Sequence, residues 1–132
     1  MLNQIIEDMK KVIATPDAPK AVGPYSQAIE VNGTLYISGQ IPVNPADGKV
    51  QEDIEAAAHQ SLKNIGAILK EAGMDYNNVV KTTVLLADIA DFKAVNEVYA
   101  EYFTGDKPAR ACYQAAALPL GVKVEIEAIA VK

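Results

Sequence analysis

The run Val79-Val80-Lys81-Thr82-Thr83-Val84-Leu85-Leu86-Ala87 sets the architecture expected of this chain. Its density of β-branched residues predicts a β-strand. Neighbouring side chains of a strand point to opposite faces of a sheet, so Leu85 and Leu86 place apolar groups on both faces. A sheet that contains this strand must therefore be covered on two sides.

The segments before and after this strand predict two amphipathic helices. The first begins at a capping Asp53, runs to about Ala72 and ends at Gly73. Its apolar stripe consists of Ile54, Ala58, Leu62, Ile65, Leu69 and Ala72. The second begins at a capping Asp91. Its apolar residues at helical spacing are Phe92, Val95, Tyr99 and Tyr102 or Phe103.

Further strands are predicted on both sides of the helices. Residues 25–31 and 34–39 flank Asn32-Gly33, a dipeptide that supplies the positive φ angles of a two-residue hairpin turn. Strands at about 110–116 and 122–131 follow the second helix. The order ββ-α-β-α-ββ predicts an α+β fold, with a mixed β-sheet and two helices packed on one face.

Two helices cover one face of this sheet and leave its second face uncovered. Ala28 and Ile29 point to opposite faces of their strand, as Leu85 and Leu86 do in theirs. An apolar face open to water would be a large adhesive patch. We therefore expect the chain to self-associate through this face as a homo-oligomer.

The 132 residues contain no repeat, low-complexity tract or linker, so residues 1–132 are expected to form a single domain. Residues 4–11 predict a short amphipathic helix, and Thr15 to Pro24, with three prolines and a glycine, predicts a loop. No apolar run approaches the roughly 18 residues of a membrane span. Acids near the N-terminus are untypical of a signal peptide, and the lone Cys112 has no internal disulfide partner. These features predict a cytoplasmic protein.

Composition also bears on partners and cofactors. The net charge of -5 and the scattered lysines argue against nucleic acid as a partner. One histidine, His59, and one cysteine do not supply the usual metal-ligand sets or a Ser-His-Asp arrangement. His59 lies just off the apolar stripe of its helix and is interpreted as a helix-surface residue. We expect neither a metal nor a cofactor.

Arg110 is the only arginine and lies within the small and apolar run from Pro108 to Pro119. Its guanidinium stays protonated and offers a flat fork of donors that matches a carboxylate. Burying such a group costs free energy unless an anion meets it. The anion could belong to one of the chain's own acids or to a ligand. Cys112, two residues away, is interpreted as a small core residue rather than a thiolate.

Two carboxylates of the last strand are candidates for a role beside Arg110. Period-2 alternation puts Glu125 and Glu127 on one face of the strand. They could be structural partners of Arg110. Alternatively, one could hold or activate a water molecule while Arg110 holds a substrate carboxylate. Spacing alone leaves both alternatives open.

Several sequence blocks follow one another along the chain. They are Gly23-Pro24-Tyr25-Ser26-Gln27-Ala28, Ser38-Gly39-Gln40-Ile41-Pro42, Lys81-Thr82-Thr83-Val84, Val95-Asn96, Pro108-Ala109-Arg110 and Val124-Glu125-Ile126-Glu127-Ala128. In this order they resemble the YjgF/Rid family of reactive-intermediate deaminases, from about residue 12 to the C-terminus, and most closely its RidA subgroup. Residues 1–11 then form an N-terminal extension. The resemblance implies a chorismate-mutase-like, YjgF-like fold and a homotrimer with a cleft at each subunit interface.

The resemblance also implies hydrolysis of 2-iminopropanoate and 2-iminobutanoate, imines released by pyridoxal-phosphate-dependent dehydratases, to a 2-oxo acid and ammonia. In that activity Arg110 would pair with the substrate carboxylate, Glu125 would hold the attacking water, and Tyr25 would help to form the catalytic pocket. Substrate binding would involve Ser38, Gly39, Asn96 and Cys112.

Family members are also described as translation inhibitors or purine regulators, so a regulatory protein that binds 2-oxo acids is an alternative. An endoribonuclease is a third, against which the acidic charge and the lack of a second histidine both count.

Overall fold

The computed structural model describes the backbone of residues 1–132 and the side chains of all of them except residues 7 and 8. Its helices are α1 (Leu2–Met9), α2 (Ile54–Glu71) and α3 (Phe92–Tyr102). Its strands are β1 (Lys11–Ile13), β2 (Ala28–Val31), β3 (Thr34–Gln40), β4 (Val79–Leu86), β5 (Ala109–Gln114) and β6 (Val124–Val131). The short 3-10 turns are η1 (Tyr76–Asn78), η2 (Ile89–Asp91) and η3 (Pro119–Gly121).

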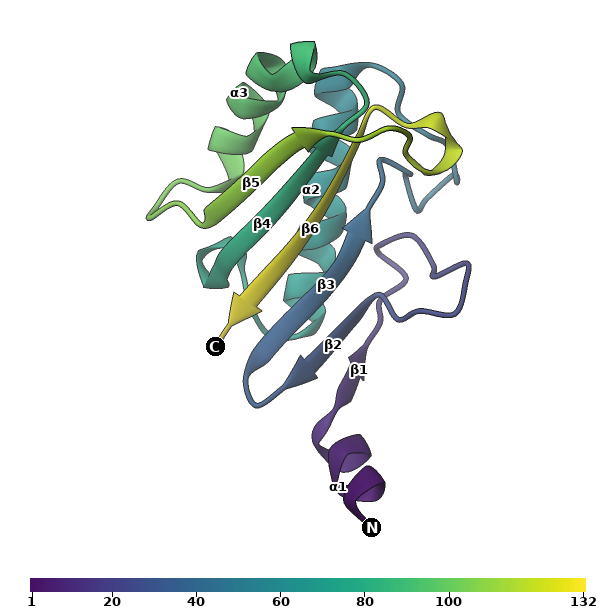
Figure 1. Ribbon diagram of the computed structural model, residues 1–132, viewed down its shortest axis with the longest axis vertical. Coiled ribbons are helices and arrows are strands. Elements are labelled where there is room, and N and C mark those ends of the chain that lie inside the picture. The colour runs from purple at the N-terminus through teal and green to yellow at the C-terminus, as the bar shows by residue number, and fades with distance from the viewer.

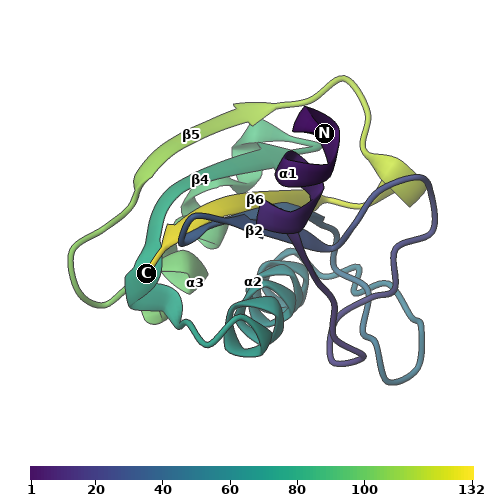
Figure 2. The same cartoon turned by 90° about the horizontal axis from the view of Figure 1, so that it is seen from below.

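The strands form one sheet in the order β1-β2-β3-β6-β4-β5 (Figure 1). β4 and β5 are parallel, because α3 carries the chain back between them, and the other neighbours are antiparallel. Helices α2 and α3 lie together on one side of the sheet (Figure 2). The α+β class, the mixed sheet and the helix placement predicted from the sequence are confirmed.

Local signals account for the elements that were predicted well. Asn32 and Gly33 have φ angles of 50° and 80° and close the hairpin between β2 and β3. The Asp53 carboxylate accepts a hydrogen bond of 3.1 Å from the Ala56 N–H at the start of α2. Gly73, with φ 73°, follows the end of that helix.

Two local predictions were wrong. Asp91 precedes α3 but makes no side-chain capping bond; the Asp88 side chain instead caps η2, the 3-10 turn that leads into α3. The N-terminal helix ends at Met9 rather than residue 11, since Lys11–Ile13 pairs with β2 as an edge strand. That pairing is a tertiary contact, which a three-residue segment does not encode locally.

The two faces of the sheet differ in cover. Val84, Leu86 and Ile126 are fully buried under α2 and α3 and form a continuous core with the helix stripes. On the opposite face Leu85 and Ile129 are half-buried and Tyr36 is 50% exposed. This open apolar face is the feature on which the predicted self-association depends. Among the described residues, no helix combines the length and apolarity that crossing a membrane requires.

Candidate active site

Arg110 lies on the exposed edge strand β5 and faces α3. Its register partner on β4 is Thr82, a buried residue of the helix-covered face, so Arg110 points to that same face. Its Nη1 donates to the Asn96 Oδ1 at 2.7 Å. The guanidinium carbon also lies 4.9 Å from the ring centroid of Tyr99 and 5.4 Å from that of Phe92. Rings at this distance attract a cation and hold the plane of the guanidinium.

Two contacts hold the aromatic rings beside Arg110 in position: a hydrogen bond of Tyr99 and the shared face of α3. The Tyr99 hydroxyl is 2.7 Å from the Thr82 hydroxyl in a buried hydrogen bond. Phe92, Asn96 and Tyr99 are three or four residues apart on α3 and therefore share one helix face. Sequence reasoning missed the two rings as site residues, although their helical spacing to Asn96 was visible.

Arg110 has no acidic partner among the side chains that the structure describes. No carboxylate whose side chain the structure describes lies within 4.0 Å of its guanidinium; the ion pairs that are formed join Lys132 to Glu30 and His59 to Glu101. The intrachain salt bridge left open by the sequence is therefore not formed among these side chains. The bond to Asn96 uses one of five donors, so the fork remains able to meet an anion.

Glu125 lies on the other face of the sheet, against Gly39. Its register partner on β4 is Leu85, which points away from the helices. A Cβ added to Gly39 would overlap the Glu125 carboxylate and lie 2.9 Å from its Cδ, so the acid occupies the space above this glycine. Burial, and then the like charge of Glu127, raise the pKa of Glu125.

The segment around Gly39 is shaped by a bulge and by the proline-rich loop. The register between β3 and β6 shifts between Ile37 and Gln40, which places an irregularity at Ser38 and Gly39. The Ser38 hydroxyl donates to the Ser26 carbonyl at 2.6 Å, and the Ser38 N–H donates to the Gln27 carbonyl. These bonds join β3 to the loop before β2.

Gln27 in turn anchors that loop. Its buried amide accepts a 2.7 Å bond from the Thr15 N–H and donates to the carbonyls of Thr15, Ala18 and Pro19. The loop and the turn after β3 enclose a groove of about 860 Å³. Tyr25, Gly39, Val22 and Leu120 are among its mainly apolar lining residues, and Tyr25 is 50% exposed.

The predicted site residues thus fall into two groups within one protomer. Arg110, Asn96 and Cys112 form the arginine half, on β5 and α3. Tyr25, Ser38, Gly39 and Glu125 form the glutamate half, at the groove and on the open face.

The sequence-based placement of Glu125 and Glu127 beside Arg110 was wrong for a single protomer. β4 lies between β5 and β6, which separates their backbones by about 10 Å, and the Arg110 side chain points to the opposite face.

Cys112 is half-buried on the same face as Arg110 and packs against the core. Burial raises the pKa of its thiol, and the Arg110 charge opposes this only in part. A reactive thiolate is therefore disfavoured, as the interpretation of Cys112 as a small packed residue requires.

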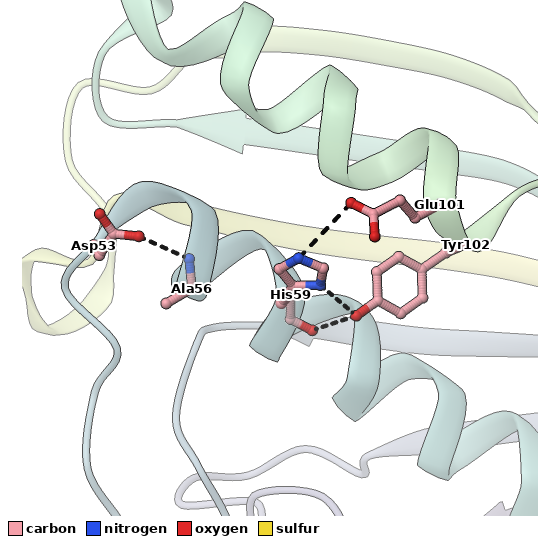
Figure 3. Close-up of polar contacts among 5 residues, drawn as sticks. All are labelled: Asp53, Ala56, His59, Glu101 and Tyr102. Carbon is pink, nitrogen blue, oxygen red and sulfur yellow. Dashed lines mark hydrogen bonds and ion pairs between the residues drawn. The ribbon is translucent and has the colours of Figure 1, made fainter.

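His59 belongs to neither half. Its Nδ1 is 2.7 Å from the Tyr102 hydroxyl and its Nε2 is 3.9 Å from a Glu101 carboxylate oxygen, which joins α2 to α3 (Figure 3). The imidazole is 35% exposed, so it is less a free surface residue than the sequence indicated. Among the described side chains, no group of three or more His, Cys, Asp or Glu residues could hold a metal ion.

The chain is similar in sequence to known proteins. The family described as Endoribonuclease L-PSP matches residues 15–132. The 2-iminobutanoate/2-iminopropanoate deaminase of Mus musculus is 60% identical over 125 residues, which cover 94% of this chain and 93% of the mouse protein.

Solved structures agree with the fold. The structure of the YjgF gene product from E. coli has a TM-score of 0.90 and 48% identity, and the match covers 92% of this chain and 98% of that one. E. coli TdcF with bound serine also has a TM-score of 0.90, with 43% identity over 92% of this chain and 98% of the other.

Proposed function

The chain belongs to the RidA/YjgF family, also described as Endoribonuclease L-PSP, and on this premise we propose that it is a 2-iminobutanoate/2-iminopropanoate deaminase. Its products are a 2-oxo acid and ammonia. The observation that carries the proposal is the exposed Arg110 fork, oriented by Asn96 and two rings and without an acid of its own among the described side chains. Serine, bound in TdcF, carries the kind of carboxylate that such a fork pairs with.

We further propose that the working site is composite and lies between protomers of a homotrimer. The arginine half lies on an exposed edge strand, and the glutamate half lies at the groove and on the open face. Neither half alone offers both a carboxylate clamp and an acid to hold water. Association through the open face would cover its apolar side chains and bring Arg110 of one protomer to Glu125 of the next.

Hydrolysis in this site needs no covalent intermediate with the enzyme. Arg110 pairs with the substrate carboxylate and fixes the position of the protonated imine, which is already electrophilic. Glu125 holds a water molecule and takes one of its protons as the water oxygen bonds to the imine carbon. Glu125 passes that proton to the amino nitrogen, and the carbon–nitrogen bond breaks. The hydroxyl proton then goes to the Glu125 carboxylate as the 2-oxo group forms and ammonia departs.

The remaining residues of the two halves position these groups. Asn96 orients the guanidinium through its bond to Nη1. The backbone at Gly39 and Cys112 contacts the substrate, while Tyr25 and Ser38 line the pocket. Each is a proposed role carried by its place in one of the two halves.

Ammonia release in a coupled threonine dehydratase assay tests the function. The protein is expected to release ammonia faster than buffer alone, and the excess rate should scale with protein concentration. Calorimetric binding of 2-oxobutanoate without any excess ammonia would contradict the deaminase and favour the regulatory alternative. The acidic chain and a histidine held between α2 and α3 give no support to RNA cleavage.

The pKa of Glu125, raised by burial and to a lesser extent by Glu127, predicts a pH effect on activity. Glu125 must be ionised to accept a proton, so kcat/KM should fall as pH falls through its raised pKa. Glu127→Gln removes the like charge, lowers that pKa, and should move the acid limb of the pH profile to lower pH. Glu71→Gln, at the end of α2, is the control and should leave the limb in place. An unmoved limb in Glu127→Gln would show that Glu127 does not raise the pKa of the group that sets the limb.

A further inference from the structure

Leu120 has an unusual backbone conformation. Its φ and ψ of 58° and 13° lie in the left-handed region, where the Cβ of an L-residue comes too close to the following carbonyl oxygen. Gly121 follows with φ 66°. The turn is held by hydrogen bonds from the Gly121 N–H to the Leu118 carbonyl, 3.1 Å, and from the Val122 N–H to the Pro119 carbonyl, 3.2 Å. Glycine or asparagine would adopt this conformation more easily than leucine.

The turn exposes the Leu120 side chain to solvent, and buried neighbouring residues hold the turn in place. Leu118 and Val122 are buried on either side, whereas Leu120 is 78% exposed. Leu120 nevertheless lines the groove that contains Tyr25 and Gly39. The turn also joins β5 to β6, the strands that carry Arg110 and Glu125. A strained residue at such a place is a reason to look for function.

We infer that Leu120 is a specificity-determining residue that binds the apolar substituent of the imine. This inference rests on the proposed deaminase function. With the carboxylate held at Arg110 and the reacting carbon at Gly39 and Glu125, the imine nitrogen and the alkyl substituent remain. The mainly apolar lining of the groove fits the alkyl substituent of the two. The preferred substrate class is therefore 2-imino acids with an apolar side chain.

The size of the groove indicates whether Leu120 favours short or long alkyl substituents of the substrate. At about 860 Å³ it is far larger than a four-carbon acid, so Leu120 does not act by excluding larger side chains. Contact with Leu120 instead removes alkyl surface from water, and each methylene group so covered contributes up to about fourfold in kcat/KM. Longer alkyl groups gain more from this contact than a methyl group does.

Leu120→Gly and Leu120→Asn test the inference, because both accept the left-handed backbone and remove the apolar side chain. The imines of leucine and of alanine are generated in situ by an L-amino acid oxidase, and kcat/KM is measured for each. The ratio of the leucine imine to the alanine imine is expected to fall by about tenfold in both variants. Their melting temperatures should be no lower than that of the unaltered protein. Ile89→Ala, an exposed apolar residue outside the groove lining, should leave the ratio unchanged.

The other outcomes are separable. An unchanged ratio in both variants, whether kcat/KM stays the same or falls equally for both imines, would overturn the role of Leu120 while leaving the deaminase proposal intact. A lower melting temperature of Leu120→Gly would contradict the strained conformation. If the unaltered protein accelerates hydrolysis of neither imine, the proposed function fails and this inference fails with it.

Discussion

Replacing Arg110 by alanine is expected to lower kcat/KM for 2-iminobutanoate by at least about 100-fold, toward the rate in buffer, because the substrate carboxylate loses its only bidentate partner in the proposed site. Arg110→Lys should lose nearly as much. Lysine keeps the charge but neither the flat fork nor the stacking on Tyr99 and Phe92 that sets its orientation. The measurement is ammonia release in the coupled threonine dehydratase assay, with the buffer rate subtracted.

This loss should come without loss of folding. Arg110 is exposed and makes one side-chain hydrogen bond to the described part of the chain, so the free energy of unfolding should change by less than about 1 kcal/mol. Lys93→Ala removes an exposed cation of α3, the helix that Arg110 faces, and is the matched control, expected to keep full activity. Full activity in either Arg110 variant would show that this guanidinium is not the carboxylate clamp.

Gly39→Ala is expected to reduce kcat/KM by about 100-fold while leaving the fold intact. The new Cβ would overlap the Glu125 carboxylate and must displace it, and a displacement of about 1 Å at a catalytic group has an effect of this size. The clash is with the end of a flexible side chain, so the free energy of unfolding should change by less than about 1 kcal/mol. Kinetics of ammonia release and urea unfolding measure the two quantities.

Gly66→Ala is the contrasting variant, because its Cβ would overlap the Tyr76 hydroxyl and lie 2.7 Å from Tyr76 Cζ. That ring cannot swing away freely, since its hydroxyl donates to the Leu62 carbonyl at 2.7 Å. Overpacking there should lower the free energy of unfolding by about 1–3 kcal/mol and leave the activity of the folded protein unchanged. Full activity in Gly39→Ala would show that catalysis does not require the Glu125 carboxylate to lie above Gly39.

The sequence predicted the elements whose signals are local. The hairpin followed from Asn32-Gly33, and α2 from Asp53, its apolar stripe and Gly73. The edge strand β1 was missed because it exists only through pairing with β2. Asp91 was predicted to cap the second helix because it directly precedes the apolar stripe. The structure places the 3-10 turn η2 before α3, and the capping side chain is that of Asp88, three residues earlier.

The positions of the candidate site residues relative to one another were harder to predict from the sequence than the helices and strands. Alternation along β6 correctly put Glu125 and Glu127 on one face, but the face of Arg110 depends on its register with Thr82 in a parallel pair. That register is not visible in the sequence of β5 alone. The resemblance to the family selected the residues, and the register shows that they divide into two halves. The stacking of Phe92 and Tyr99 on Arg110 also needed the position of α3 relative to β5.

The central claim is that Arg110 of one protomer works with Glu125 of another, and subunit mixing tests it most directly. Arg110→Ala and Glu125→Ala chains carrying different affinity tags are co-expressed, and mixed trimers are isolated by purifying on both tags. In the proposed cyclic trimer each mixed assembly has one intact site among its three clefts, so about a third of the activity should return although each variant alone is inactive. Mixing Arg110→Ala with the double variant should restore nothing. Mixed trimers as inactive as their parents would contradict a site shared between protomers.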